Sequence, residues 1–116
     1  MSTPRDPRIL LWDMNNGALA IAQFVDGISD SEFEENDLIR AAVERKFSII
    51  GEALDALFKS NPDLAARISD FRQIINFRHL LNHHYSKVES YTIWTTVKDD
   101  LPKLIENLSN LLTELG

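Results

Sequence analysis

The sequence predicts an all-α fold, a four- to five-helix antiparallel up-and-down bundle. Three observations support this prediction. Apolar residues recur every three or four positions along four segments, the connections between the segments are short, and no segment alternates apolar and polar residues as a strand would. Each amphipathic helix needs a partner for its apolar face, so we expect the four to pack together as one domain over residues 1–116.

The first expected helix covers about residues 7–28. Pro7 suits the first helical turn, and Gly27 with the polar residues after it ends the helix. Ser31 and Glu34 have the spacing of a capping box, which predicts a short helical turn before the next helix. The apolar stripe of the first helix is Leu10, Met14, Gly17, Ile21, Phe24 and Ile28.

The second expected helix covers about residues 37–59. It ends at Asn61 because the following residue, Pro62, disfavours a helical conformation in the residue before it. A short connecting segment with apolar residues follows at 64–68. The stripe of the second helix is Val43, Phe47, Ile50, Leu54 and Leu57.

The third expected helix begins near Ser69 and Asp70, which can both serve as N-caps, and reaches at least Leu81. Its buried residues are expected to be Phe71, Ile74 and Ile75. The polar run 82–86 lacks a helical period and predicts the helix end and a turn.

The fourth expected helix covers about residues 90–115. Pro102 cannot donate a hydrogen bond to the carbonyl of Lys98, so we expect a kink there. The stripe of this helix, which we expect to be buried, is Val97, Leu101, Leu104, Leu108, Leu111 and Leu115.

Composition limits the possible functions. The net charge of -6 disfavours non-specific nucleic-acid binding, so a nucleic-acid site needs a local basic patch. The absence of cysteine excludes disulfides and thiolate metal sites. No signal peptide or membrane span is expected, and an intracellular, cytoplasmic protein without membrane partners is the simplest expectation.

The candidate site is a short stretch that holds all three histidines. His79, His83 and His84 lie between Arg78 and Tyr85. An imidazole can exchange a proton at neutral pH, and a guanidinium can clamp a phosphate, so the stretch suits RNA cleavage without a metal ion or other cofactor. The alternative is that these residues are ordinary polar groups at the end of a helix.

The spacing within this stretch sets a geometric condition. Arg78 and His83 are five residues apart, so on a continuous helix they point about 140° away from each other. They can act on one ligand if the helix ends between them, as the polar residues from Asn82 onward suggest, or if a second subunit supplies one of them. His79 and His83 also have metal-ligand spacing, but the stretch lacks a carboxylate and contains an arginine, so no metal site is predicted.

The order Arg78, four residues, His83, one residue, Tyr85 resembles the Arg-x4-His-x-Tyr motif of the HepT-like ribonuclease toxins of the HEPN superfamily. Segment 43–53 resembles the second-helix signature of this family, including Ile-Gly-Glu-Ala, and segment 93–104 resembles its fourth helix, including Asp-Leu-Pro. His84 stands where many members have glycine.

This resemblance implies a two-fold homodimer in which the two motifs face one shared cleft. It implies a metal-independent endoribonuclease, the toxin of a type VII-like toxin–antitoxin pair, with Arg78 and His83 as catalytic residues and His79 and Tyr85 in support. The implied partners are the RNA substrate and a minimal nucleotidyltransferase (MNT-type) antitoxin. In some members that antitoxin transfers AMP from ATP to the motif tyrosine, here Tyr85.

Other candidate residues have simpler explanations. Trp12 and Trp94 are expected in the core or a dimer interface rather than stacked on bases. The carboxylates Glu44, Glu52, Asp99 and Asp100 are expected to serve structural or surface roles, and Asp55 is expected to pair with Lys59.

Two alternatives to the ribonuclease toxin stay open from the sequence. One is a non-catalytic HEPN adaptor that binds a nucleotidyltransferase or a nucleotide, which the acidic net charge favours. The other is a histidine-based metal-binding bundle.

Overall fold

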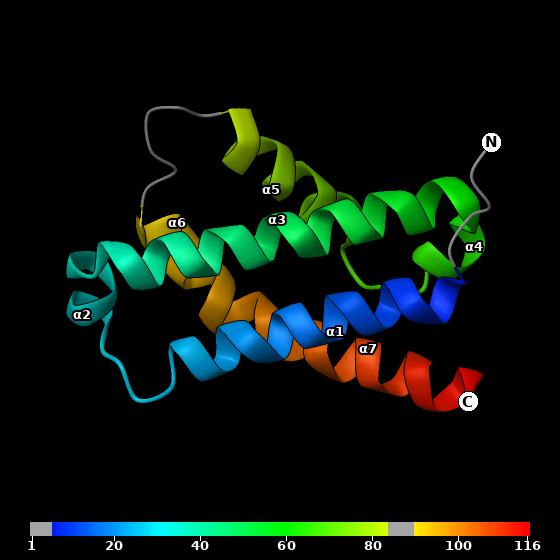
Figure 1. Cartoon of the computed structure of the whole chain (residues 1–116), viewed down its shortest axis with the longest axis horizontal. Helices are drawn as coiled ribbons and strands as arrows, with labels where there is room; N and C mark the ends of the chain where they lie inside the picture. The colour runs from blue at the N-terminus through cyan, green and yellow to red at the C-terminus, as the bar shows by residue number, and fades with distance from the viewer. Residues whose placement is uncertain (1–5, 84–89) are drawn as a thin grey trace.

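The computed structural model describes residues 6–83 and 90–116, with the backbone alone at residues 71, 79, 80, 82 and 83. The described residues form helices and no strand. In chain order the elements are α1 (Pro7–Phe24), α2 (Asp30–Glu35), α3 (Asp37–Ser60), α4 (Pro62–Ala65), α5 (Phe71–His83), α6 (Ser90–Thr95), the π-helical turn η1 (Thr96–Asp100) and α7 (Leu101–Leu115). The long helices α1, α3, α5 and α7 alternate in direction (Figure 1), which confirms the predicted up-and-down bundle.

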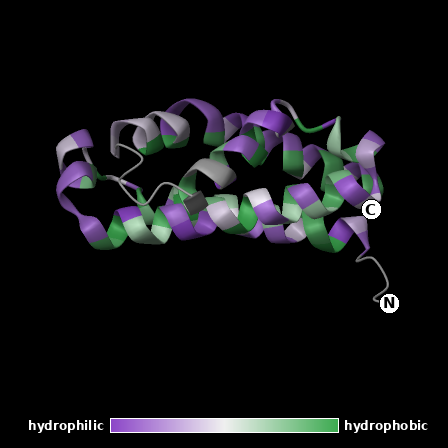
Figure 2. Ribbon diagram, turned by 90° about the horizontal axis from the view of Figure 1, so that it is seen from above, coloured by the Kyte–Doolittle hydropathy of each residue, from purple (hydrophilic) through white to green (hydrophobic). Residues whose placement is uncertain are grey.

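The core lies between the inner faces of α1, α3 and α7, and polar residues cover the outer faces (Figure 2). The predicted stripe of the second helix is buried throughout. Two stripe predictions were wrong at helix ends: Phe24 is 37% exposed and Leu115 is 39% exposed, and each is the last residue of its helix. No helix among the described residues is long and apolar enough to cross a membrane.

Helix α1 ends earlier than predicted, at Phe24 instead of residue 28. The Asp6 side chain accepts a hydrogen bond from the backbone N–H of Arg8 (2.9 Å) and caps the start. The chain turns after Phe24, where Gly27 takes a φ of 76°, a left-handed conformation that glycine adopts without strain.

The capping box lies two residues before its predicted position. The backbone N–H of Glu32 donates to the Ser29 hydroxyl (3.2 Å), and the backbone N–H of Ser29 donates to the Glu32 carboxylate (3.2 Å). With the capping box at Ser29 and Glu32 instead of Ser31 and Glu34, the Phe33 side chain is buried in the core. Its ring stacks on that of Trp94 with centroids 4.7 Å apart.

The two tryptophans have different environments. Trp94 is only 8% exposed, and its indole N–H donates to Asp30 while the Lys98 ammonium lies 5.2 Å from the ring centroid. These contacts hold α6 against α2. Trp12 is 62% exposed, so it does not belong to the core of one chain, and its predicted interface role is untested.

The last predicted helix is divided into α6 and α7 by η1. Instead of a simple kink at Pro102, the chain forms a π-helical turn in which the N–H of Leu101 donates to the carbonyl of Thr96, five residues earlier. Pro102 then lies in the first turn of α7, where a helix needs no N–H from it. The residues Val97, Leu101, Leu104, Leu108 and Leu111 are all buried, as predicted.

Candidate functional site

The helix that carries the candidate motif, α5, is fixed at its start by α7. The backbone N–H of Ser69 donates to the Asn107 side-chain oxygen (2.8 Å), and the Asn107 amide donates to the carbonyl of Arg67 (3.2 Å). Asp70 has a φ of 60°, a conformation that aspartate tolerates better than most residues, and its carbonyl accepts the first helical bonds from Gln73 and Ile74. The chain therefore reverses sharply and α5 returns along α3 (Figure 1).

Two aromatic contacts join α5 to α3. The rings of Phe77 and Phe47 meet edge to face with centroids 5.2 Å apart, and the Arg72 guanidinium lies 5.5 Å from the centre of the Phe58 ring. These geometries are favourable for aromatic pairs and for a cation over a ring. Since Phe47 and Phe58 lie at opposite ends of the contact, they define how α5 lies on α3.

On α3, Gly51 lies between Phe47 and Phe58, and the predicted catalytic residue Arg78 lies directly on it. A Cβ atom at Gly51 would be 2.4 Å from the Arg78 Cβ, 2.9 Å from its Cγ and 3.0 Å from its Cδ. The Arg78 Nε is buried and has no hydrogen-bond partner among the described residues. An unpaired buried donor costs about 1–3 kcal/mol, so this arginine is better suited to an acceptor from outside the described fold than to a structural role.

The prediction that the helix ends between Arg78 and His83 was wrong. Helix α5 continues through Asn82 to His83, since polar residues can extend a helix whose hydrogen bonds are already formed. On this continuous helix, positions 78 and 83 are separated by about 140° around the axis.

The remaining motif residues are described in part or not at all. For His79 and His83 the structure gives the helical backbone alone, and His84 and Tyr85 lie outside the described residues. Among the described residues, no group of three or more histidine, aspartate or glutamate side chains could hold a metal ion. The predicted roles of these four residues therefore stay predictions.

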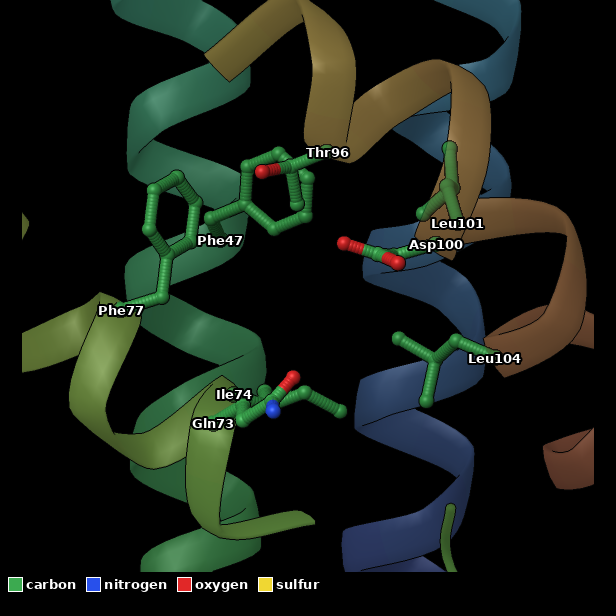
Figure 3. A pocket seen from close by; sticks show the side chains of 8 residues that line it. All are labelled: Phe47, Gln73, Ile74, Phe77, Thr96, Asp100, Leu101 and Leu104. Carbon is green, nitrogen blue, oxygen red and sulfur yellow. The ribbon is translucent and has the colours of Figure 1, made fainter. Parts of the chain in front are cut away.

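A groove of about 160 Å³ lies between α5 and the segment formed by η1 and α7 (Figure 3). Its walls are mostly apolar, with Phe47 and Phe77 on one side and Leu104 on the other. The Asp100 carboxylate points into the groove. Because this groove separates α5 from α7, the contacts of α5 within the described part of the chain are mainly with α3.

Three other candidate carboxylates lie on α3. Asp55 pairs with Lys59 at 3.0 Å, which confirms that prediction. Glu52 is exposed, and Glu44 is half-buried on α3. Burial raises the pKa of the Glu44 carboxyl, against an opposing effect of the positive charge on Arg40.

The reasoning from sequence did not single out Gly51 as a site residue. It lies in the Ile-Gly-Glu-Ala segment that resembles the second-helix signature of the HepT-like toxins, and a glycine in the middle of a 24-residue helix is itself a signal, because it costs about 1 kcal/mol relative to alanine. Its importance becomes visible only when α5 is placed.

Comparison with known proteins identifies the family of this chain. The family described as ribonuclease HepT-like matches residues 14–111, a range that includes Gly51, Arg78 and His83. The chain belongs to the ribonuclease HepT-like family. Membership supports a ribonuclease function.

Several relatives have names of the same kind. The chain is 31% identical to "Putative RNase MJ1380" of Methanocaldococcus jannaschii, over 86% of this chain and 91% of that protein. It is 28% identical to "Putative RNase MJ0125" of the same organism, over 96% and 95%. It is 30% identical to "Putative RNase TTE0752" of Caldanaerobacter subterraneus, over 93% and 96%. No solved structure gives a significant match.

Proposed function

We propose that this chain is a metal-independent endoribonuclease in which Arg78 and His83 are the catalytic residues. The observation that carries the proposal is the state of Arg78, whose stem is packed against Gly51 and whose buried Nε has no partner among the described residues. Such an arginine is held in place and still has an unused donor. Family membership makes RNA the expected substrate.

The proposed chemistry uses the RNA's own 2′-hydroxyl. His83 accepts the proton of this hydroxyl, the 2′-oxygen attacks the adjacent phosphorus, and the bond from phosphorus to the 5′-oxygen breaks. The 5′-oxygen takes a proton from an imidazole or water, which leaves a 2′,3′-cyclic phosphate and a 5′-hydroxyl end. Arg78 stabilises the charge that develops on the phosphate, and His79 orients the phosphate or assists proton transfer.

A two-fold homodimer would bring the required groups together. Positions 78 and 83 are about 140° apart on α5, so Arg78 of one protomer would act with His83 of its partner. Pairing two chains would also gather two copies of Arg78, which creates a local positive cleft on a protein with a net charge of -6 per chain. Sedimentation at tens of micromolar should give the mass of a dimer, and a monomer alone would contradict this arrangement.

The test of the activity is cleavage of a randomised RNA pool in EDTA. We expect cleavage to persist, to leave cyclic phosphate ends, and to fall by about 10²–10⁴-fold in His83→Ala. Arg78→Ala should lose a comparable factor. The matched control is Arg67→Ala, because the Arg67 side chain forms a surface ion pair with Glu114 at 2.5 Å, and its carbonyl, which accepts from Asn107, is kept in the variant. Full activity of His83→Ala, or complete loss in EDTA, would refute the mechanism.

We further propose that the enzyme is a toxin neutralised by an MNT-type nucleotidyltransferase. In the proposed reaction the Tyr85 hydroxyl oxygen attacks the α-phosphorus of ATP, pyrophosphate leaves, and the phenolic proton passes to solvent. The product carries a phosphodiester two residues beyond His83, whose charge would occupy Arg78 and repel RNA. This proposal rests on the resemblance of the motif, since Tyr85 lies outside the described residues.

Mass spectrometry after incubation with ATP and the cognate transferase tests this regulation. Wild type should gain one adenylate and lose RNA cleavage, whereas Tyr85→Phe should do neither. Tyr91→Phe is a suitable control, because Tyr91 is a 74% exposed tyrosine on α6 and not part of the motif. Normal neutralisation of Tyr85→Phe by an ATP-dependent transferase would contradict the proposal.

The alternative is a non-catalytic adaptor that binds a nucleotidyltransferase or a nucleotide. The net charge of -6 favours this function over binding of free RNA. The two proposals separate in the same assay: an adaptor binds its partner and leaves RNA intact with or without metal ions.

A further inference from the structure

Two glycines lie inside long helices at helix–helix contacts. Gly17 is on α1 and Gly51 is on α3, and both are buried. A glycine within a helix lowers helix stability, so each position needs a compensating contact. The two contacts differ in kind, and the difference concerns Arg78.

At Gly17 the space is limited by the end of a side chain. An added Cβ would lie 3.1 Å from Cγ1 of Ile50 and 3.5 Å from its Cδ1. The nearest atom belongs to a side chain, and a shift of Ile50 by a few tenths of an ångström is enough to relieve this overlap. A methyl group at this position therefore needs little movement of either helix.

At Gly51 the space is limited by the backbone of α5. An added Cβ would lie 2.4 Å from the Cβ of Arg78, and the position of a Cβ is fixed by its own backbone. No rotamer change can relieve this overlap. Since carbon atoms in contact prefer a separation of about 3.5–4.0 Å, α5 would have to move by about 1 Å.

We propose that Gly51 is a positioning residue for Arg78: its missing side chain sets the distance of α5 from α3 and so places the guanidinium at the scissile phosphate. This inference rests on the proposed function. On α5 both ring contacts with α3 lie before Arg78, and the nearer one is made by the adjacent residue Phe77, whose ring packs on Phe47. The backbone next to Arg78 therefore cannot move away from α3 without disturbing this contact. A displacement at Gly51 is therefore transmitted to Arg78.

The expected effect of Gly51→Ala is a fall in kcat of about 10–100-fold, because a displacement near 1 Å of a group that stabilises the transition state costs up to about 10²-fold. KM should change much less, since binding of the RNA chain depends on other contacts. The matched control is Gly17→Ala, the same chemical change at a helix contact that does not touch Arg78. It should stay within about 3-fold of wild type, well below the effect of losing positioning.

A double-variant cycle distinguishes positioning from general damage. If Gly51 acts through Arg78, then adding Gly51→Ala to Arg78→Ala should reduce the residual kcat by less than about 2-fold. An equal loss in both backgrounds would overturn the proposal. So would a Gly51→Ala protein with wild-type kcat, or a Gly17→Ala protein with the same loss as Gly51→Ala.

Thermal unfolding tests the contact without any activity. Gly51→Ala should lower Tm by at least about 4 °C in the wild-type background, and should leave Tm unchanged or raise it in Arg78→Gly, where the overlapping atoms are gone. If Gly51→Ala alone fails to fold, the double variant Gly51→Ala/Arg78→Gly should fold again. A double variant that stays unfolded would overturn the proposal.

The same measurements separate the inference from the proposed function. Wild type that cleaves no RNA would refute the ribonuclease and with it a positioning role in cleavage, whatever the thermal result. Active wild type with unaltered Gly51→Ala would refute only the inference.

Discussion

Helix α3 packs against its neighbours in two different ways. Toward the core that it shares with α1 and α7 it presents aliphatic side chains, of which Ile50, Leu54 and Leu57 are fully buried. Toward α5 it presents a glycine between aromatic rings, and the facing residues Ile74, Phe77 and Arg78 are only half-buried. The first interface is formed by aliphatic side chains, while the second contains the unpaired buried donor of Arg78.

This difference indicates how the molecule separates stability from chemistry. Burial of aliphatic side chains between α1, α3 and α7 supplies most of the favourable free energy of folding. The contact of α5 with α3 can then tolerate an unsatisfied Arg78 Nε, which a protein with a smaller core could not accommodate as easily. The described helices leave part of the surface of α5 uncovered.

The largest effect on stability is expected in the first interface. Leu108 is fully buried on α7, so Leu108→Ala should lower the free energy of unfolding by about 2–5 kcal/mol through lost burial and a cavity. Leu38→Ala is the control, because Leu38 is 80% exposed and its loss should change stability by less than about 0.5 kcal/mol. Urea unfolding followed by circular dichroism measures both, and equal effects would show that the core is misplaced.

A smaller effect is expected in the second interface. Ile74 is half-buried on α5 beside the groove in Figure 3, so Ile74→Ala should cost about 1–2 kcal/mol, less than a fully buried isoleucine. If a second protomer covers α5, the cost should increase with protein concentration. A loss as large as that of Leu108→Ala at every concentration would erase the distinction between the two interfaces.

The sequence predicted the first interface well, since it depends on periodicity alone. The stripe from Val43 to Leu57 and the run from Val97 to Leu111 are buried as expected. A stripe of apolar residues at helical spacing has one low-energy arrangement, with its face turned inward. Such patterns specify which residues enter the core without any knowledge of their neighbours.

The sequence predicted local details less well because competing patterns overlap. Ser29–Glu32 and Ser31–Glu34 both have capping-box spacing, and the stacking of Phe33 on Trp94, which is 61 positions further along the chain, accompanies the first. Likewise, α5 extends to His83 although its last residues have no apolar period. Long-range packing decides such details, and a local pattern does not contain it.

The candidate site shows the same division. Arg78 and His83 stand out from their chemistry, whereas Gly51 has no chemistry of its own and matters through the approach of a helix distant in sequence. The π-helical turn before Pro102 was expected only as a kink, because the proline indicates a missing donor and not how the chain compensates for it.

A still smaller effect is expected where α2 meets α6. The indole N–H of Trp94 donates to Asp30, which with the nearby Lys98 ammonium (3.5 Å) holds the pKa of that carboxyl below its usual range. A lowered pKa means that this stabilisation is present above the unfolded-state pKa and is lost as pH falls through the folded-state pKa. Asp30→Asn keeps an acceptor for Trp94 but loses the charge.

We therefore expect Asp30→Asn to be slightly less stable than wild type at pH 7, with the difference disappearing in acid below the ordinary aspartate pKa. Thermal scans between pH 2 and pH 7 measure this. A difference that stays constant over the whole range would show that the charge is not what holds α6 to α2.

The smallest expected effect has the opposite sign and lies on the α5 side of α3. Glu44 is seven residues, or about two turns, before Gly51 on the same face, and burial raises the pKa of its carboxyl despite the positive charge of Arg40. A raised pKa means that the folded protein holds this proton more tightly, so stability decreases as pH rises from the unfolded-state pKa through the folded-state pKa. Glu44→Gln removes this cost and should be slightly more stable than wild type at pH 7. In acid, where the glutamate is protonated in both states, the two proteins should be equally stable.

Glu52→Gln is the matched control, since Glu52 is exposed on the same helix and should show no such pH-dependent gain. A Glu44→Gln protein that is less stable at pH 7 would mean that the carboxylate has a favourable partner on α5, and that this interface is more polar than its described residues indicate.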